Sequence, residues 1–150
     1  MKTLATLITI ILAITTSVLQ AQQLTAKSYL EQTYVGPKLG TAIGLMFPCN
    51  IEVGGFYQES TTAFGEAETL PWLKERQFAG AFMNYPIMQK EFLGLSFNIR
   101  TGVSNGENFL ITPTVLGYIM PLPRVKVSGG LGVRAFSPTL QGGITLVLSK

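Results

Sequence analysis

Few residues of this chain could carry out acid–base or metal chemistry. The sequence contains no His and no Asp, and its single cysteine, Cys49, lies in a predicted turn between Pro48 and Asn50. Zinc sites and His-dependent catalytic triads therefore have neither ligands nor a general base. One cysteine cannot form a disulfide within the chain. We expect no metal site, no cofactor and no enzymatic activity.

The other chemically notable residues are charged side chains that alternate with apolar ones. Residues 125–135 place apolar side chains or Gly at odd positions and Lys, Arg, Ser or Gly at even positions, and residues 93–103 repeat this pattern. A period of two is typical of a β-strand with one apolar and one polar face. The polar faces are predicted to carry five charged residues that point into an enclosed interior: Lys38, Glu52, Arg100, Lys126 and Arg134.

This predicted set is unbalanced, because it holds four basic residues and one acidic residue. Buried charges need partners. Either water and a loop acid such as Glu59 compensate, or one assignment of a strand face is wrong.

Seven segments of the chain have the period-two pattern of strands. An eighth is expected either from 22–32, which we favour, or from the long connection at 60–76. Pro113 predicts a β-bulge, and the Asn105-Gly106 dipeptide predicts a tight hairpin turn. The seven segments are 33–47, 51–58, 78–85, 92–103, 109–120, 125–135 and 140–149, with proline-marked turns at 48–50, 86–90, 121–123 and 137–138.

The first 21 residues have the features of a secretory signal peptide. Lys2 is followed by an apolar run, and Ala21 is the small residue expected before cleavage. Residues 22–150 then form a single domain that contains no apolar run long enough for a transmembrane helix. We expect an exported protein whose spanning elements, if it enters a membrane, are strands.

Alternation alone does not distinguish a soluble barrel from a membrane barrel. The charged fraction is 13%, about half of what soluble domains contain, and many of the 16 glycines fall within the alternating segments. Glycines on a polar face leave room for long charged side chains inside a narrow barrel. The prediction is therefore a transmembrane barrel with its apolar face outward.

These features together resemble the small, porin-like outer-membrane β-barrel proteins of Gram-negative bacteria. The resemblance covers roughly 33–150, and it implies an antiparallel up-and-down transmembrane β-barrel, most simply of eight strands, located in the cell outer membrane. Members of this class that act as enzymes depend on His or Asp, and this chain has neither.

Three functions remain open. The leading hypothesis is a non-enzymatic barrel with a structural, surface-interaction or envelope-complex accessory role, in contact with outer-membrane lipid. Its 60–76 loop would contact an envelope protein through Phe64, Glu66, Glu68 and Trp72. The alternatives are a narrow anion-biased channel and a soluble periplasmic lipid-binding barrel. Without a cluster of basic residues, no nucleic-acid partner is expected.

Overall fold

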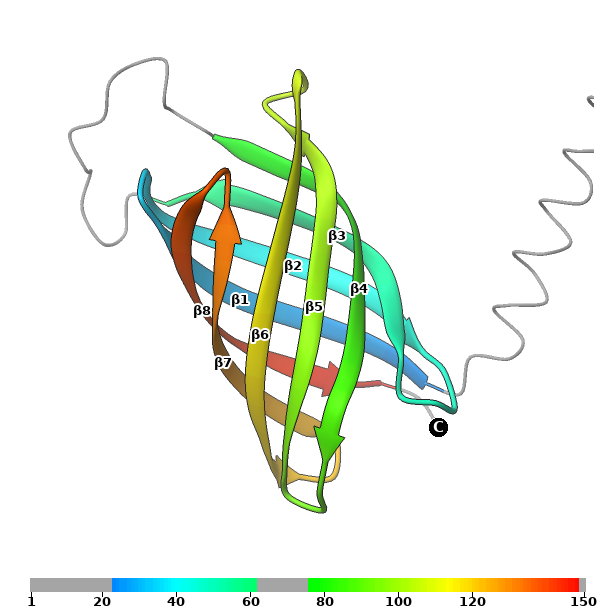
Figure 1. Cartoon of the computed structure of the whole chain (residues 1–150). Helices are drawn as coiled ribbons and strands as arrows, with labels where there is room; N and C mark the ends of the chain where they lie inside the picture. Colours follow the sequence, from blue (N-terminus) through cyan, green and yellow to red (C-terminus); the bar gives the residue numbers. More distant parts are fainter. Residues whose placement is uncertain (1–22, 62–75, 149–150) are drawn as a thin grey trace, which may run out of the picture.

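The computed structural model describes residues 23–61 and 76–148, which form a closed antiparallel barrel (Figure 1). Each strand pairs with its neighbours in sequence, and β8 closes the barrel against β1. The predicted all-β, eight-stranded barrel is confirmed, and its eighth strand is the N-terminal one. The strands are β1 (Gln23–Thr33), β2 (Gly36–Met46), β3 (Glu52–Ser60), β4 (Gln77–Gln89), β5 (Leu93–Ser104), β6 (Asn108–Leu122), β7 (Val125–Arg134) and β8 (Ser137–Val147).

The barrel has two different ends. The lower end in Figure 1 holds both ends of the barrel domain and the turns at 47–51, 90–92 and 123–124. The upper end holds the turns at 34–35, 105–107 and 135–136, together with the two residues, Thr61 and Arg76, that flank the segment 62–75. The predicted signal peptide and most of the predicted loop lie outside the described residues, within which no helix is long and apolar enough to span a membrane.

Side chains alternate between the inside and the outside of the barrel along every strand. On β5, Ser96, Asn98 and Arg100 are buried, whereas their odd-numbered neighbours are more exposed. On β7, Leu131 is 66% exposed and Arg134 only 3%. The apolar face therefore points outward, as predicted for a membrane barrel and opposite to a soluble barrel.

Three of the predicted proline turns are wrong in position. Pro86 lies within β4, at a register shift between Pro86 and Met88, and the turn follows at 90–92. Pro121 likewise lies within β6, inside a second register shift between Ile119 and Leu122. Pro138 lies within β8, because the chain already turns at 135–136. A barrel strand accommodates proline where the hydrogen-bonded ladder is interrupted, so these prolines mark irregular strand ends instead of turns.

Two other local predictions have opposite outcomes. Pro113 pairs with Ile99 without a register shift, so the predicted bulge is wrong, and the pairing of β6 with β7 begins one residue later, at Thr114. The Asn105-Gly106 turn is confirmed: both residues have positive φ, and the Glu107 amide donates to the Ser104 carbonyl. This is the conformation that favours Asn-Gly in hairpins.

Inward-facing glycines make room inside the narrow barrel. The ring of Tyr29 covers Gly40, its partner on β2, so closely that a Cβ on Gly40 would lie 2.2 Å from the ring atom Cζ. Tyr118 covers Gly94 in the same way on β5 and β6. The large interior side chains are therefore accommodated by bare backbone on the neighbouring strand.

Candidate functional site

The structure encloses the predicted charged residues within the barrel. Lys38, Glu52, Arg100 and Arg134 are buried, and Lys126, closer to the lower end, is half-buried. They come from four strands, β2, β3, β5 and β7, with Lys126 and Arg134 both on β7, and each lies on the inward-facing set of positions of its strand. The barrel interior is therefore the candidate functional site.

The centre of this interior is a buried carboxylate, Glu31 of β1, which binds two guanidinium groups. Arg100 forms two contacts with it, Nη2 to Oε1 at 2.6 Å and Nη1 to Oε2 at 3.2 Å. Arg134 Nη1 donates to Oε2 at 3.1 Å. The Gln58 side chain completes the group, donating to Glu31 Oε2 at 2.7 Å and accepting from Arg134 Nη1 at 3.1 Å.

These four residues form a layer across the barrel, which we call the Glu31 plug: Glu31, Gln58, Arg100 and Arg134. They come from β1, β3, β5 and β7, one from each odd-numbered strand, and their exposed fractions are 0–3%. Side chains from alternate strands fill a small barrel in layers of this kind. The Glu31 plug therefore closes the interior to solvent at its level.

Aromatic rings on β1, β3 and β4 pack beside the plug. The guanidinium of Arg134 lies 4.1 Å from the ring centroid of Phe78, and that of Arg100 lies 5.1 Å from the ring of Tyr29. Phe56 packs edge-on against Phe78 at 4.7 Å. Cation–π contacts of desolvated guanidinium groups add to their ion pairs. Half of the interior is thus an aromatic core that holds the plug in place.

Sequence reasoning missed Glu31 and the neighbouring inward-facing Lys27. Both lie in 22–32, where the outward positions include Ser28 and Gln32 and the inward positions include Tyr29, so the two faces differ little in polarity. The signal that could have found Glu31 was the charge balance, because four enclosed bases against one acid required another carboxylate. The suggested compensating residue, Glu59, instead faces outward on β3.

Below the plug, the interior is polar and more open. Glu52 accepts a hydrogen bond from the Thr25 hydroxyl, and Lys126 Nζ lies 3.8 Å from the sulfur of Met46 and over the Tyr118 ring. Lys27, Tyr118 and Lys126 are only half-buried. Within the described residues, no group of three or more His, Cys, Asp or Glu side chains could hold a metal ion.

The β5 to β8 side of the interior carries polar groups in place of aromatic rings. Asn98, Thr114, Gly132 and Thr139 are consecutive partners in one row across four strands. The side-chain oxygens Oδ1 of Asn98 and Oγ1 of both threonines are buried and have no hydrogen-bond partner in the protein. Buried groups of this kind are ordinarily satisfied by water. This wall therefore suits internal water.

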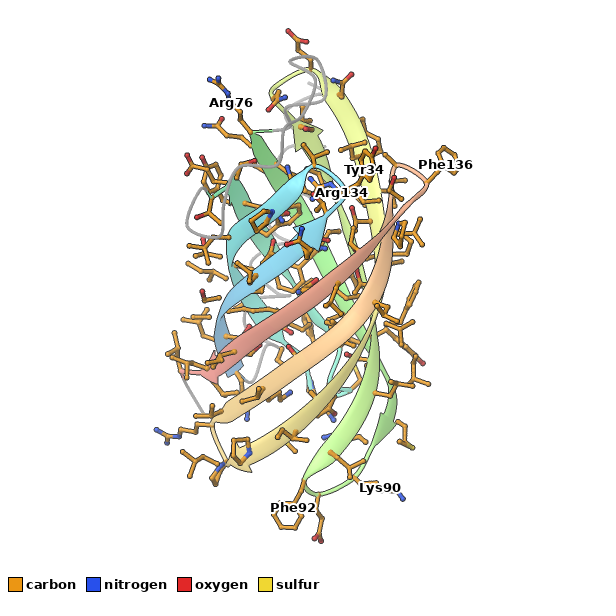
Figure 2. The ribbon with its side chains drawn as sticks, turned by 90° about the vertical axis from the view of Figure 1, so that its left-hand side faces the viewer. Tyr34, Arg76, Lys90, Phe92, Arg134 and Phe136 are labelled. Atoms are coloured by element: carbon orange, nitrogen blue, oxygen red, sulfur yellow. The ribbon has the colours of Figure 1, made fainter. Side chains whose placement is uncertain are left out.

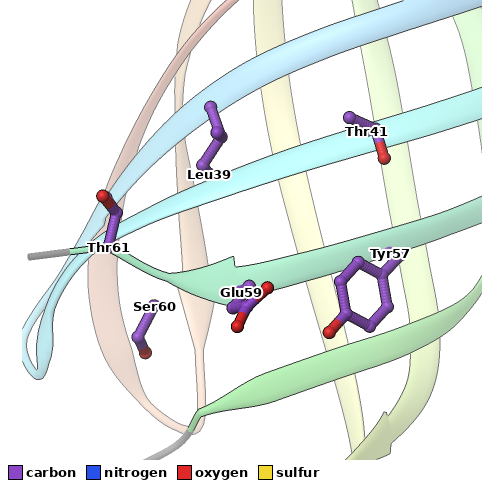
Figure 3. Close-up of a pocket in the computed structure, with 6 residues that line it drawn as sticks. All are labelled: Leu39, Thr41, Tyr57, Glu59, Ser60 and Thr61. Carbon is purple, nitrogen blue, oxygen red and sulfur yellow. The ribbon is translucent and has the colours of Figure 1, made fainter.

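A shallow groove of about 300 Å³ lies on the outer wall, near the upper ends of β2 and β3 (Figure 3). Its polar lining includes Glu59, the only charged side chain on the outward face of the eight strands described. Of the residues predicted to contact a partner, Phe64, Glu66, Glu68 and Trp72 lie outside the described residues. The groove is lined by Leu39, Thr41, Tyr57, Glu59, Ser60 and Thr61.

Comparison with solved structures identifies the architecture. A chain described under "De novo design of transmembrane beta-barrels" aligns with a TM-score of 0.68 and 7% identity, over 85% of this chain and 97% of that chain. The designed barrel TMB2.3, solved by NMR, aligns with a TM-score of 0.62 and 10% identity, over 87% and 99% of the two chains. The fold is that of a small transmembrane β-barrel.

Similarity to this barrel architecture is found in structure but not in sequence. Neisserial surface protein A aligns with a TM-score of 0.46 and 15% identity, over 84% of this chain and 95% of that chain. No protein-family profile matches the sequence, and no curated protein matches it significantly.

Proposed function

We propose that this protein is a small, non-enzymatic outer-membrane β-barrel with a structural, surface-interaction or envelope-complex accessory role. The observation that carries the proposal is the inside-out distribution of side chains. Large apolar residues on all eight strands are turned outward, whereas seven of the eight charged residues in the strands are turned inward. Soluble proteins rarely expose an apolar surface that is continuous around the whole molecule. Lipid is the environment that suits such a wall.

The Glu31 plug favours a closed barrel over a conducting channel. Arg100 and Arg134, two of the four bases expected to attract anions, are both bound to Glu31 and held against aromatic rings. An ion crossing the barrel would have to disrupt these contacts. We therefore expect no stable conductance from the purified protein in planar-bilayer recording.

Membrane residence is tested by extraction and by gel mobility. The mature protein should stay in the membrane pellet after carbonate washing, and it should migrate differently before and after boiling, because a folded barrel resists detergent until heated. Release by carbonate, together with identical migration of the two samples, would contradict the proposed barrel role.

A partner-binding role is assigned to the connection at 60–76. Support comes from its first two residues, Ser60 and Thr61, which line the outer-wall groove, and from its apolar and acidic composition in the sequence. Exposed loops on a rigid scaffold commonly carry binding sites. Deleting 64–72 should abolish recovery of envelope partners in a pull-down while gel mobility remains that of a folded barrel. Unchanged recovery would remove this assignment.

A further inference from the structure

Three inward-facing residues near the lower end lie on one row across adjacent strands. Thr145 of β8 is the register partner of Lys27 on β1 and also of Lys126 on β7. The two lysines are therefore separated by one strand, or about 10 Å between backbones. Long side chains from such positions can converge on one ligand, and Thr145, whose side chain is buried, lies on the strand between them.

Each ammonium group lies against an aromatic ring and not against a carboxylate. Lys27 Nζ is 5.6 Å from the ring centroid of Tyr29, and Lys126 Nζ is 5.3 Å from that of Tyr118. Within the described residues, neither lysine forms an ion pair within 4.0 Å. An aromatic face attracts a cation but does not neutralise its charge.

The carboxylates of the interior do not balance these two lysines. Glu31 is bound by Arg100 and Arg134 in the plug. Glu52 is within electrostatic range of both lysines, and it also accepts the hydrogen bond of Thr25. Two ammonium groups facing one carboxylate leave a surplus positive charge, and both lysine side chains are only half-buried.

We propose that Lys27, Thr145 and Lys126 bind a phosphate-class oxyanion below the Glu31 plug. Two ammonium groups donate charge-assisted hydrogen bonds and a hydroxyl donates a neutral one, and the oxygens of such an anion accept them. The Glu31 plug closes the interior above these three residues, so the anion would reach them from the lower end. The phosphate belongs either to a free anion or to a lipid headgroup.

The test is titration of the full mature protein, folded in a zwitterionic detergent, by calorimetry at constant ionic strength. One arm uses inorganic phosphate, and a second uses a short-chain phosphatidic acid in the same micelles. Binding in both arms supports a site open to free anions, and binding of the phosphatidic acid alone supports a headgroup site. Binding in neither arm would overturn the proposal.

Three variants assign the binding to these residues. Lys27→Gln with Lys126→Gln should weaken binding at least about tenfold, since both charge-assisted contacts are removed. Thr145→Val, which removes one hydroxyl, should weaken it a few-fold. Lys90→Gln, an exposed lysine in the 90–92 turn of the same end, should leave binding unchanged.

Two outcomes of the variant series would overturn the site. Full binding by the double variant would show that the lysines are not ligands, and an equal loss in Lys90→Gln would show nonspecific attraction to a basic surface. Heat-dependent gel mobility checks that each variant is folded. If the double variant does not fold, the single Lys126→Gln variant replaces it, because Lys126 is half-buried and close to the lower end.

Discussion

Glu31 is the residue on which the interior depends most. It is fully buried and accepts from both Arg100 and Arg134, so its removal takes away the carboxylate that both buried guanidinium groups contact. Breaking a buried ion pair by removing one partner is much more destabilising than losing a surface pair. The Glu31 plug therefore depends on a single carboxylate.

Glu31→Gln tests this role. We expect it to lower the free energy of unfolding by about 3–5 kcal/mol, because both arginines stay buried after losing the carboxylate that they contact. Urea unfolding in lipid vesicles measures the change. Glu59→Gln makes the same chemical change on the outer wall of β3, and it should cost less than about 1 kcal/mol. Equal effects of the two substitutions would show that the plug is not a stabilising element.

The residue scale is also where prediction from sequence was least complete. The inward positions of Lys38, Arg100 and Arg134 follow from alternation, but the identity of their partner does not. Alternation assigns a face and contains no information on which strands meet across the barrel. The contact of Arg134 with Glu31 joins residues 103 positions apart, and it depends on closure of β8 against β1.

At the scale of the strand, adjacent glycines on β7 have opposite surroundings. Gly130 faces inward, and a Cβ there would lie 1.9 Å from the carbonyl oxygen of Val115. Gly129 faces outward, and its Cβ would be 3.8 Å from the nearest heavy atom. Sharp strand curvature at defined glycines is needed to close small barrels.

This difference predicts unequal effects of two matched substitutions. Gly130→Ala should destabilise the barrel by about 1–3 kcal/mol, the usual cost of overpacking that must shift backbone. Gly129→Ala should change stability by less than about 0.5 kcal/mol. Both are measured by urea unfolding in vesicles, and a larger effect at Gly129 would show that the strand face is assigned wrongly.

The hairpin between β7 and β8 is strained. Its two turn residues, Ala135 and Phe136, both have positive φ, although neither residue type favours that conformation. Figure 2 shows Phe136 projecting away from the barrel, so packing against the wall does not explain why a phenylalanine occupies this position. Replacing the pair with Asn-Gly should raise the free energy of unfolding by about 1 kcal/mol, because the turn type is kept and the strain is removed. A loss of stability would mean that Phe136 makes a contact important for folding in the membrane.

Element boundaries show which part of the fold the sequence could predict. Seven of the eight strands, most of their faces and the Asn105-Gly106 turn follow from local patterns, which have short-range physical causes, whereas the eighth strand followed from the even strand count of such barrels. The ends of β4, β6 and β8 do not, because proline in the sequence predicts a turn. In this barrel Pro86, Pro121 and Pro138 lie in strands, two of them near a register shift that only the pairing with a neighbouring strand defines.

At the scale of the whole molecule, apolar substitutions on the outer wall should change stability little, whereas charged substitutions there should be destabilising. Val115 lies at the middle of β6 and faces outward. Val115→Arg should cost about 2–4 kcal/mol if this position is at the centre of the bilayer. Phe109→Arg, near the upper end of the same strand, should cost about 0–1 kcal/mol, because it lies closer to water. Urea unfolding in vesicles measures both, and equal costs would contradict a spanning orientation.

The central claim, apolar side chains in hydrocarbon and charged ones enclosed, is tested most directly by fluorescence quenching. With Trp72→Phe to remove the native tryptophan, a single tryptophan is placed at Val115 or at its inward-facing neighbour Leu116, and the protein is folded into vesicles of lipids brominated on their acyl chains. The account predicts strong quenching at position 115 and little at position 116. Quenching at 116 and not at 115 would contradict it.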